Sequence, residues 1–485
     1  MDEDVSEKYK TQLMEPMVEP AEAEKRPPSF YLCNAVHMSS CFLLVFTSFS
    51  AIQNLAGSYF FDSLGFIGGT VLYITFAVSC LFGPLIGAKL GAKWSLFCGF
   101  LGYTVYTGCA MVTAMVFVAT KNESAVPQEA CVNGSASANL TKEYCYNTQA
   151  GWGIELFGTA TCGFCASFLW YAEGVYITRS AKKYSEAVVR SSQGEKTPKD
   201  AAGFFNGIFF GFFQITQILG NLVGGLLFSA GWSFPNICLV YLVFAVAGAI
   251  VCFFLRAVNS AEERQKEAAK SVADRLKGPV ALLVKDMRLP LLVPYMIYSG
   301  MEMVFIWSDF TANYVKPVLG GGDIGFLMAV FGASDAAFSL LVGKLSDVVG
   351  QLPMVLVGFG AQAAVLLFFQ FYPAWSDTTE TATITLYVCA GVWGLGDAVA
   401  NTVMYAIVGR YFDSGSEVGD AFANLKLWQS VACAAAFAYS LASDDFSKEV
   451  RRFGILGCLV ISAIAYIILA TWQGRKKVSP LPNGE

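Results

Sequence analysis

The chain has 485 residues, of which 55% are hydrophobic and only 14% are charged, and its net charge is −5. Soluble domains carry about 25% charged residues, and a compact domain of this size needs a charged surface to stay in water. The composition therefore excludes an ordinary soluble protein and indicates a chain whose solvent is lipid. The net charge itself carries little information, because the location of charges matters more than their sum in a membrane protein.

Twelve apolar segments follow one another along the chain, each near the length of about 20 residues that a membrane helix needs. Residues 1–30 are polar and contain no cleavable signal peptide, so the first segment is expected to act as an uncleaved signal anchor. A charged stretch at 256–288 divides the segments into two groups of six, which is typical of two-bundle transporters. The segments are 31–55, 66–86, 94–118, 151–177, 203–229 and 234–255, then 290–313, 324–343, 352–372, 382–408, 419–442 and 453–472.

These segments predict an all-α, polytopic membrane protein with twelve transmembrane helices in two six-helix bundles. Residues 31–255 would form the N-terminal bundle and 289–472 the C-terminal bundle. The stretch 256–288 would be a cytoplasmic linker with a surface helix, which either tethers the bundles or meets anionic lipid headgroups through its basic side chains. Residues 1–30 and 473–485 would be tails.

The positions of lysine and arginine orient the predicted helices, because cytoplasmic loops are enriched in both residues. With the N-terminus in the cytoplasm, 25 of the 32 lysines and arginines fall in cytoplasmic segments and six in external segments. The remaining one, Lys426, lies inside the eleventh segment. We therefore predict that both termini are cytoplasmic.

The predicted external loop at 119–150 agrees with this orientation, since it holds all three N-glycosylation sequons of the chain. Cys131 and Cys145 share the loop, whereas the other cysteines lie mostly in apolar runs, where the thiol acts as a small hydrophobic group. Oxidation is permitted on the external side of a membrane, so we predict a disulfide between the two. The sequons are Asn122-Glu-Ser, Asn133-Gly-Ser and Asn139-Leu-Thr.

A loop motif recurs at the same place in both halves. After the eighth segment comes Gly343-Lys-Leu-Ser-Asp347-Val-Val-Gly350-Gln351, which matches the glycine-x-leucine-x-aspartate-x-x-glycine-basic loop of the major facilitator superfamily except for its final Gln. The stretch from Gly83 to Lys93, after the second segment, is a degenerate copy without the aspartate. The glycines permit a tight turn, and Asp347 is expected to cap a helix end or pair near one. The repetition supports two related halves and the major facilitator fold.

Five further stretches, spread over residues 46–430, resemble one branch of that superfamily, the Unc-93-like ion channel regulatory family, and are closest to its plant-type members. Glu173 occupies a position where many relatives have Gln. The stretches are Phe46-Thr-Ser-Phe-Ser-Ala-Ile-Gln53-Asn54-Leu55, Trp170-Tyr-Ala-Glu173-Gly174-Val-Tyr176-Ile-Thr178, Tyr298-Ser-Gly-Met-Glu302 continuing to Thr311, Gly394-Leu-Gly396-Asp397 with Asn401, and Ala421-Phe-Ala-Asn-Leu-Lys426-Leu-Trp428-Gln429-Ser430. The superfamily fold implies alternating access, whereas this branch implies regulators or escorts of channels that have lost transport.

Ionisable side chains at membrane depth are costly and usually face a cavity or a partner. In the seventh segment Ser299, Glu302, Asp309 and Asn313 fall on one helical stripe, for which we favour a water-filled central cavity. The tenth segment places Asp397 and Asn401 on one face. Together with the family motifs, these stripes identify eight candidate residues for a cavity, ion or substrate site. The candidates are Glu302, Asp309, Asp397, Asn401, Glu173, Gln53, Asn54 and Lys426.

The sequence allows two interpretations of several polar residues. The stripe of the fifth segment either bonds neighbouring helices together or lines the cavity. Glu155 and Glu173 either join that cavity or reach the headgroups, and Lys426 either extends toward the interface or pairs with an acid. His37 is expected to be a hydrogen-bonded structural residue rather than a proton switch. Asp335 is expected to lie where helices pack closely and to have a capping role. The fifth-segment stripe comprises Asn206, Gln214, Gln217 and Asn221.

No Walker loop follows a strand, and the sequence contains neither a Gly-x-Ser-x-Gly elbow nor an HExxH helix. We expect no enzyme, no cofactor, no metal site and no nucleic-acid partner. The leading function is regulation or escort of another membrane protein, a channel or receptor and foremost a potassium channel, in the plasma membrane or an endomembrane. The alternative is a proton- or cation-coupled carrier of a small solute that uses Glu302, Asp309 and Asp397. A pore of its own would need a filter-like run such as TVGYG, which the sequence lacks.

Overall fold

The computed structural model describes residues 26–59, 64–121, 139–192, 201–258, 271–319, 324–372, 379–412, 417–440 and 445–478. Every regular element in these ranges is a helix, and each of the twelve predicted segments overlaps one. The helices are α3 Pro28–Tyr59, α4 Leu64–Cys80, α5 Gly83–Lys121, α7 Asn139–Ser191, α8 Ala202–Ser229, α9 Phe234–Phe253, α11 Val272–Lys285, α12 Arg288–Val304, η1 Phe305–Val315, α13 Lys316–Leu319, α14 Ile324–Val349, α15 Gln351–Phe371, α16 Thr379–Ala398, η3 Val399–Val403, α17 Met404–Tyr411, α18 Glu417–Ser440 and α19 Asp445–Val478.

Nine stretches of the described helices are long and apolar enough to cross a membrane, and a tenth, Ile67–Cys80 in α4, is apolar but shorter. The other two predicted spans lie in α7 and α18. The all-α architecture of a multi-pass membrane protein is thus confirmed, while the count of twelve crossings stays a prediction. Outer helices also expose large apolar side chains, for example Val243 of α9 and Ile461 of α19, as lipid-facing surfaces do.

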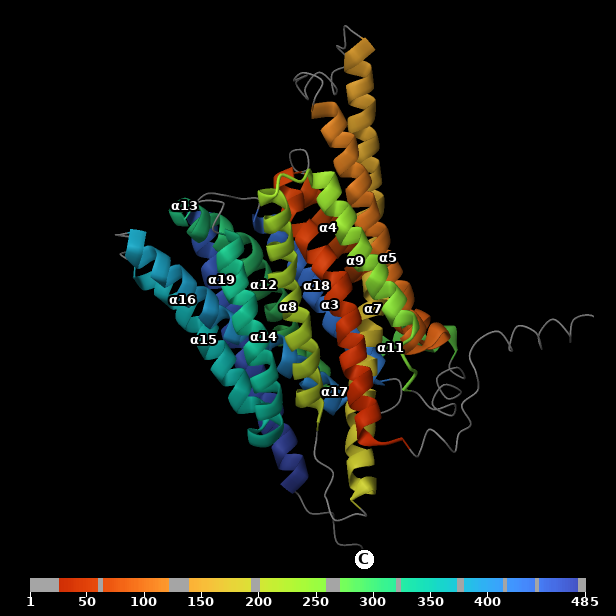
Figure 1. Cartoon of the computed structure of the whole chain (residues 1–485). Coiled ribbons are helices and arrows are strands. Elements are labelled where there is room, and N and C mark those ends of the chain that lie inside the picture. The colour runs from red at the N-terminus through yellow and green to blue at the C-terminus, as the bar shows by residue number, and fades with distance from the viewer. Residues whose placement is uncertain are drawn as a thin grey trace, which may run out of the picture.

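The helices associate in two halves. In the first half, α3 packs against α8 and α9, and α5 packs against α7 and α9. In the second half, α12 packs against α18 and α19, and α16 packs against α14 and α15. Figure 1 shows α3, α5, α7 and α9 at one side of the molecule and α14, α15, α16 and α19 at the other.

The halves meet where α8 contacts α14 and where α18 contacts α4 and α7. Glycines permit the first of these contacts: a Cβ on Gly207 would lie 2.7 Å from the carbonyl oxygen of Ser339, and one on Gly343 would lie 2.4 Å from that of Gly203. Such distances leave no room for a side chain, so the backbones of α8 and α14 touch directly.

The repeated loop motif has a common backbone feature in the two halves. Gly91, inside α5, has φ of 74°, and Gly350, just before α15, has φ of 95°. Both values lie in the left-handed region that favours glycine, which explains a glycine at each turn. The expected cap by Asp347 is also present: its carboxylate accepts hydrogen bonds from the backbone N–H groups of Gly203 (3.0 Å) and Phe204 (2.7 Å) at the start of α8.

Three segments differ from the sequence-based boundaries. Helix α7 has 53 residues and begins at Asn139, so the end of the predicted 119–150 loop is helical. The seventh segment changes from an α-helix to an 11-residue π-helix at Phe305. Of the linker, α11 is the described helix, with Ser271 capping its start by accepting from the N–H of Asp274 at 3.1 Å. Asn122, Asn133 and Cys131 lie outside the described residues, as do the side chains of Asn139 and Cys145.

Candidate functional site

A cavity lies between the two halves, with walls from α3, α4, α5, α7 and α8 on one side and α12, η1, α14, α16, η3 and α18 on the other. The space open to the centres of water-sized molecules is about 80 Å³, which is room for about five to eight waters, since one water needs about 10–15 Å³ on this measure. Of the sequence-predicted candidates, Gln53, Asp397, Asn401 and Lys426 line it.

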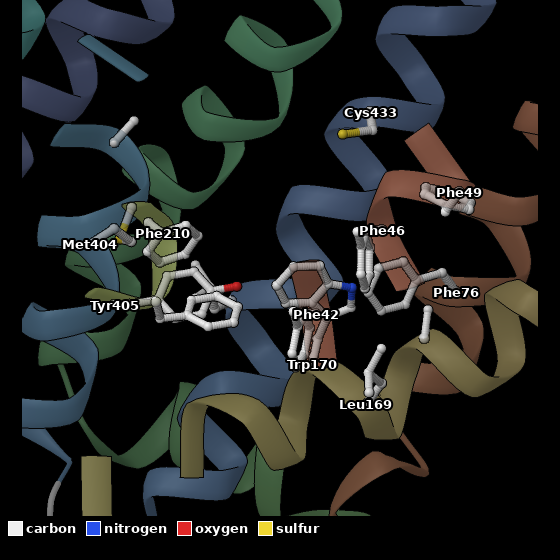
Figure 2. Packing of buried hydrophobic residues seen from close by; sticks show 14 of the residues in the cluster. Phe42, Phe46, Phe49, Phe76, Leu169, Trp170, Phe210, Met404, Tyr405 and Cys433 are labelled. Atoms are coloured by element: carbon white, nitrogen blue, oxygen red, sulfur yellow. The ribbon is translucent and has the colours of Figure 1, made fainter. Parts of the chain in front are cut away.

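Aromatic side chains form much of the cavity wall. Trp170 of α7 packs against Phe46 of α3, with ring centroids 5.4 Å apart, and Phe210 of α8 meets Tyr405 of α17 at 4.9 Å in an edge-to-face contact. Figure 2 shows these two ring pairs, Trp170 beside Phe46 and Tyr405 beside Phe210. The Phe210–Tyr405 contact joins the halves, and aromatic pairs of this geometry add about 0.5–1.5 kcal/mol beyond their buried area.

Lys426 is the cationic group of the cavity wall and is only 6% exposed. Its ammonium lies 4.1 Å from the ring centroid of Trp170 and 5.1 Å from that of Tyr405, and it donates a 2.6 Å hydrogen bond to Oε1 of Gln429. Cation–π contacts of a desolvated ammonium are worth about 2 kcal/mol or more. The side chain therefore points into the protein and does not extend toward the membrane interface.

Glu173 is the acid that interacts electrostatically with Lys426. Its side chain is 0% exposed, and neither carboxylate oxygen has a hydrogen-bond partner within the part of the chain that the structure describes. Glu173 and Glu155, which is 2% exposed, lie inside the long helix α7. Of the two interpretations left open for these acids, the one in which they reach the headgroups does not fit their burial, and neither acid lines the cavity.

Asp397 brings an acid of the second half to the cavity. Its carboxylate accepts hydrogen bonds from Nδ2 of Asn401 at 3.0 Å and from Nε2 of Gln214 at 3.1 Å. Gln214 belongs to α8, so this second bond crosses between the halves. Gln214 therefore both bonds neighbouring helices together and lines the cavity, the two roles considered for the fifth-segment stripe. Asp397 also lies within hydrogen-bonding reach of Glu302 and Asp335.

Glu302 lies behind the cavity wall and is 0% exposed. Its Oε2 accepts hydrogen bonds from Nε2 of Gln362 at 2.9 Å and from Nε1 of Trp393 at 3.1 Å. Asp335 is also 0% exposed and lies in the interior of α14, where Ser339 donates a 3.1 Å hydrogen bond to its Oδ1. The close packing expected at Asp335 is present, since a Cβ on Gly394 would lie 3.0 Å from its backbone nitrogen, but the expected capping role is not.

Asp309, although on the same predicted stripe as Glu302, has a different partner. Its carboxylate forms a buried ion pair with Arg451 of α19 at 3.0 Å and accepts a 2.7 Å hydrogen bond from Asn313. Asp309 does not line the cavity. Helical periodicity could not identify this partner, because Arg451 lies 142 positions away along the chain.

The remaining candidates occupy structural positions. His37 donates a 2.9 Å hydrogen bond to the carbonyl oxygen of Val251, as expected of a structural histidine. Asn54 lies in α3, and its side chain is outside the described part of the structure. No group of three His, Cys, Asp or Glu side chains that could hold a metal ion occurs among the described residues. Sequence reasoning missed Gln362 and Trp393, which carry no charge and follow no polar stripe.

Comparison with known proteins gives concordant results. The sequence profile of the ion channel regulatory protein UNC-93 family matches residues 152–444. UNC93-like protein 3 of Arabidopsis thaliana is 27% identical over 86% of this chain and 84% of its own length. Human protein unc-93 homolog A is 25% identical, with coverage of 94% and 96%. The putative potassium channel regulatory protein unc-93 of Caenorhabditis elegans is 26% identical over 83% of this chain and 56% of its own length.

Solved structures identify the fold. The major facilitator proton:xylose symporter XylE superimposes with a TM-score of 0.59 and 12% identity, covering 92% of this chain and 96% of its own. A bacterial homologue of the iron transporter ferroportin, in an outward-facing state, gives a TM-score of 0.62 and 10% identity, with coverage of 90% and 99%. The fold is therefore that of the major facilitator superfamily, as predicted.

Proposed function

Because the chain belongs to the UNC-93 family of ion channel regulatory proteins, we propose that it regulates or escorts another membrane protein, with a potassium channel as the first candidate. The family match carries this proposal, since it reaches from α7 in the first half of the chain to the end of α18 in the second. A relative from Caenorhabditis elegans is named a putative potassium channel regulatory protein.

The polar groups of the cavity support the same proposal. Lys426 is already bonded to Gln429 and rests on aromatic rings, and Asp397 accepts bonds from Gln214 and Asn401. A carrier must leave polar groups available to its substrate, because an orienting group that is paired within the protein gains little from a ligand. The cavity is also small, with room for about five to eight waters.

A coupled secondary carrier of a small solute is the second candidate. One observation favours it: the cavity lies between the two halves, where transporters of this architecture bind substrate. Buried acids such as Asp397 are also typical of proton or cation pathways.

Two measurements on the intact protein separate the candidates. Co-expression with each of a panel of potassium channels should change the potassium current or the surface amount of at least one channel, whereas a major facilitator sugar symporter expressed at the same level should change none. Proteoliposomes of the purified protein should show no solute-dependent flux of protons, Na⁺ or K⁺. Flux without any effect on the channels would overturn the regulatory proposal.

We further propose that both termini face the cytoplasm, and that residues 119–150 are external or lumenal, with sugars on Asn122, Asn133 and Asn139 and a Cys131–Cys145 disulfide. The distribution of lysine and arginine supports this orientation. The protein would reside in the plasma membrane or an endomembrane, in contact with lipid over its apolar perimeter.

A further inference from the structure

Three buried acids of the second half meet at one point beside the cavity. They come from three helices, Glu302 from α12, Asp335 from α14 and Asp397 from α16, and their exposed fractions are 0%, 0% and 3%. Asp397 is the central member, because it lies within hydrogen-bonding reach of each of the other two. Within the described part of the chain, none of the three forms an ion pair with a lysine or arginine.

Three ionised carboxylates cannot share such a site, because like charges repel strongly where water is excluded and burial already disfavours each charge. Either a cation or bound protons must relieve the repulsion. The described residues offer no arrangement of three acidic, histidine or cysteine ligands suited to a metal ion, and carboxyl groups at hydrogen-bonding distance from each other are held most simply by a proton between them.

The hydrogen-bond donors around the cluster indicate which oxygens carry the protons. Oε2 of Glu302 accepts two hydrogen bonds and Oδ1 of Asp335 accepts one, so these atoms act as acceptors. Among the described residues, Oε1 of Glu302 and Oδ2 of Asp335 accept no hydrogen bond, although both side chains are fully buried. A buried oxygen that accepts no hydrogen bond destabilises the folded state. If that oxygen carries a proton, it can instead donate a hydrogen bond to Asp397.

We propose that Glu302, Asp335 and Asp397 form a proton-binding site in which an ionised Asp397 accepts hydrogen bonds from protonated Glu302 and protonated Asp335. With the bonds from Gln214 and Asn401, the Asp397 carboxylate then has four donors for its two oxygens. The cluster carries one negative charge, and every one of its six oxygens has a hydrogen-bond partner. This satisfies the rule that buried polar networks are stable when complete.

The site has a direct connection to the arrangement of the two halves. Gln214, which belongs to the first half, donates its 3.1 Å bond to the central carboxylate. Loss of a proton from either neighbour places a second negative charge beside the carboxylate that accepts that bond. Proton binding is therefore coupled to a contact between the halves, and this holds for a regulator as well as for a carrier.

The other titratable groups that interact with the cluster are phenols and a thiol. Tyr295 and Tyr298 of α12 and Cys433 of α18 interact electrostatically with Glu302. Lys426 of α18 lines the same cavity as Asp397. The side chains that reach the cluster from α8 and α15 are the amides of Gln214 and Gln362, and neither titrates.

Infrared difference spectroscopy on the purified full-length protein tests the proposal. A protonated carboxylic acid has a carbonyl stretching band that a carboxylate lacks and that shifts in D₂O. At neutral pH the spectrum of the unmodified protein minus that of Glu302→Gln should contain one such band, and so should the spectrum minus that of Asp335→Asn. Asp309→Asn is the matched control, because Asp309 pairs with Arg451 and should remain ionised.

The result expected is thus a band removed by Glu302→Gln and by Asp335→Asn but not by Asp309→Asn. Thermal unfolding of each variant monitors folding, and if only one of the two cluster variants folds, that variant alone tests the proposal. Absence of a protonated-acid band in the difference spectrum of either folded cluster variant would overturn the proposal, as would its loss in Asp309→Asn alone. Because no channel or solute is involved, failure of this test is distinguishable from failure of the regulatory function.

Discussion

Replacing Asp347 by alanine should loosen the contact between the halves at the start of α8. The carboxylate is an N-terminal cap supplied by the other half, accepting from the N–H groups of Gly203 and Phe204 at 3.0 and 2.7 Å. Loss of a helix cap costs about 1–2 kcal/mol, and loss of a negative charge at a partly buried helix N-terminus costs about 1 kcal/mol more. The sum of about 2–3 kcal/mol corresponds to a change of about 30–150-fold in an equilibrium constant.

The assay measures how often this contact opens. Ser346 is 0% exposed, and its Oγ would lie 2.4 Å from a Cβ on Gly203. In a background without native cysteines, Ser346→Cys should therefore react slowly with a water-soluble maleimide. Addition of Asp347→Ala should increase that rate by about 30–150-fold. Asp347→Asn retains one acceptor and should increase it by about fivefold, for a cost of about 1 kcal/mol.

Lys344→Cys provides the control, because Lys344 is exposed on the same helix. Its labelling rate should be the same with and without Asp347→Ala. An unchanged rate at Ser346→Cys would refute the reasoning that Asp347 holds the halves together. An equal increase at both cysteines would also refute it, since that would report general unfolding.

Three other predictions concern different parts of the molecule. Gly207→Ala should lower the stability to thermal unfolding by about 1–3 kcal/mol, because its Cβ would lie 2.7 Å from a carbonyl oxygen of α14. Gly225→Ala is the control: it lies in the same helix with nothing within 4 Å and should be neutral. Equal losses of stability in the two variants would contradict this account. Arg451→Gln should cost about 3–5 kcal/mol because it leaves the Asp309 charge buried and unpaired. Adding Asp309→Asn should recover most of that loss, and no recovery would mean that the ion pair is not the cause. Glycosidase treatment of protein from eukaryotic cells should increase its gel mobility through loss of sugars in 119–150, and a cytosolic reporter signal from this loop would reverse the proposed orientation.

The positions of the helices were determined by the sequence alone. The segment predicted at 234–255 is α9, Phe234–Phe253, and that predicted at 352–372 is α15, Gln351–Phe371. Such agreement has a physical reason: backbone N–H and C=O groups in lipid must be bonded within the segment, so a long apolar run becomes a helix whatever its neighbours are. The boundaries of α7 were not predictable, because its polar extensions lie beyond the apolar run.

The partners of the buried polar residues were decided by the tertiary structure. Helical periodicity placed Glu302 and Asp309 on one stripe, yet Glu302 meets Asp397 while Asp309 pairs with Arg451. The two acids are separated by about 10 Å along an ideal helix axis, and the π-helix that begins at Phe305 changes the rotation between them. Asp335 is part of the acid cluster for the same reason: it comes close to Asp397 only because α14 packs against α16. A sequence specifies which face of a helix is polar, and only packing determines what that face meets.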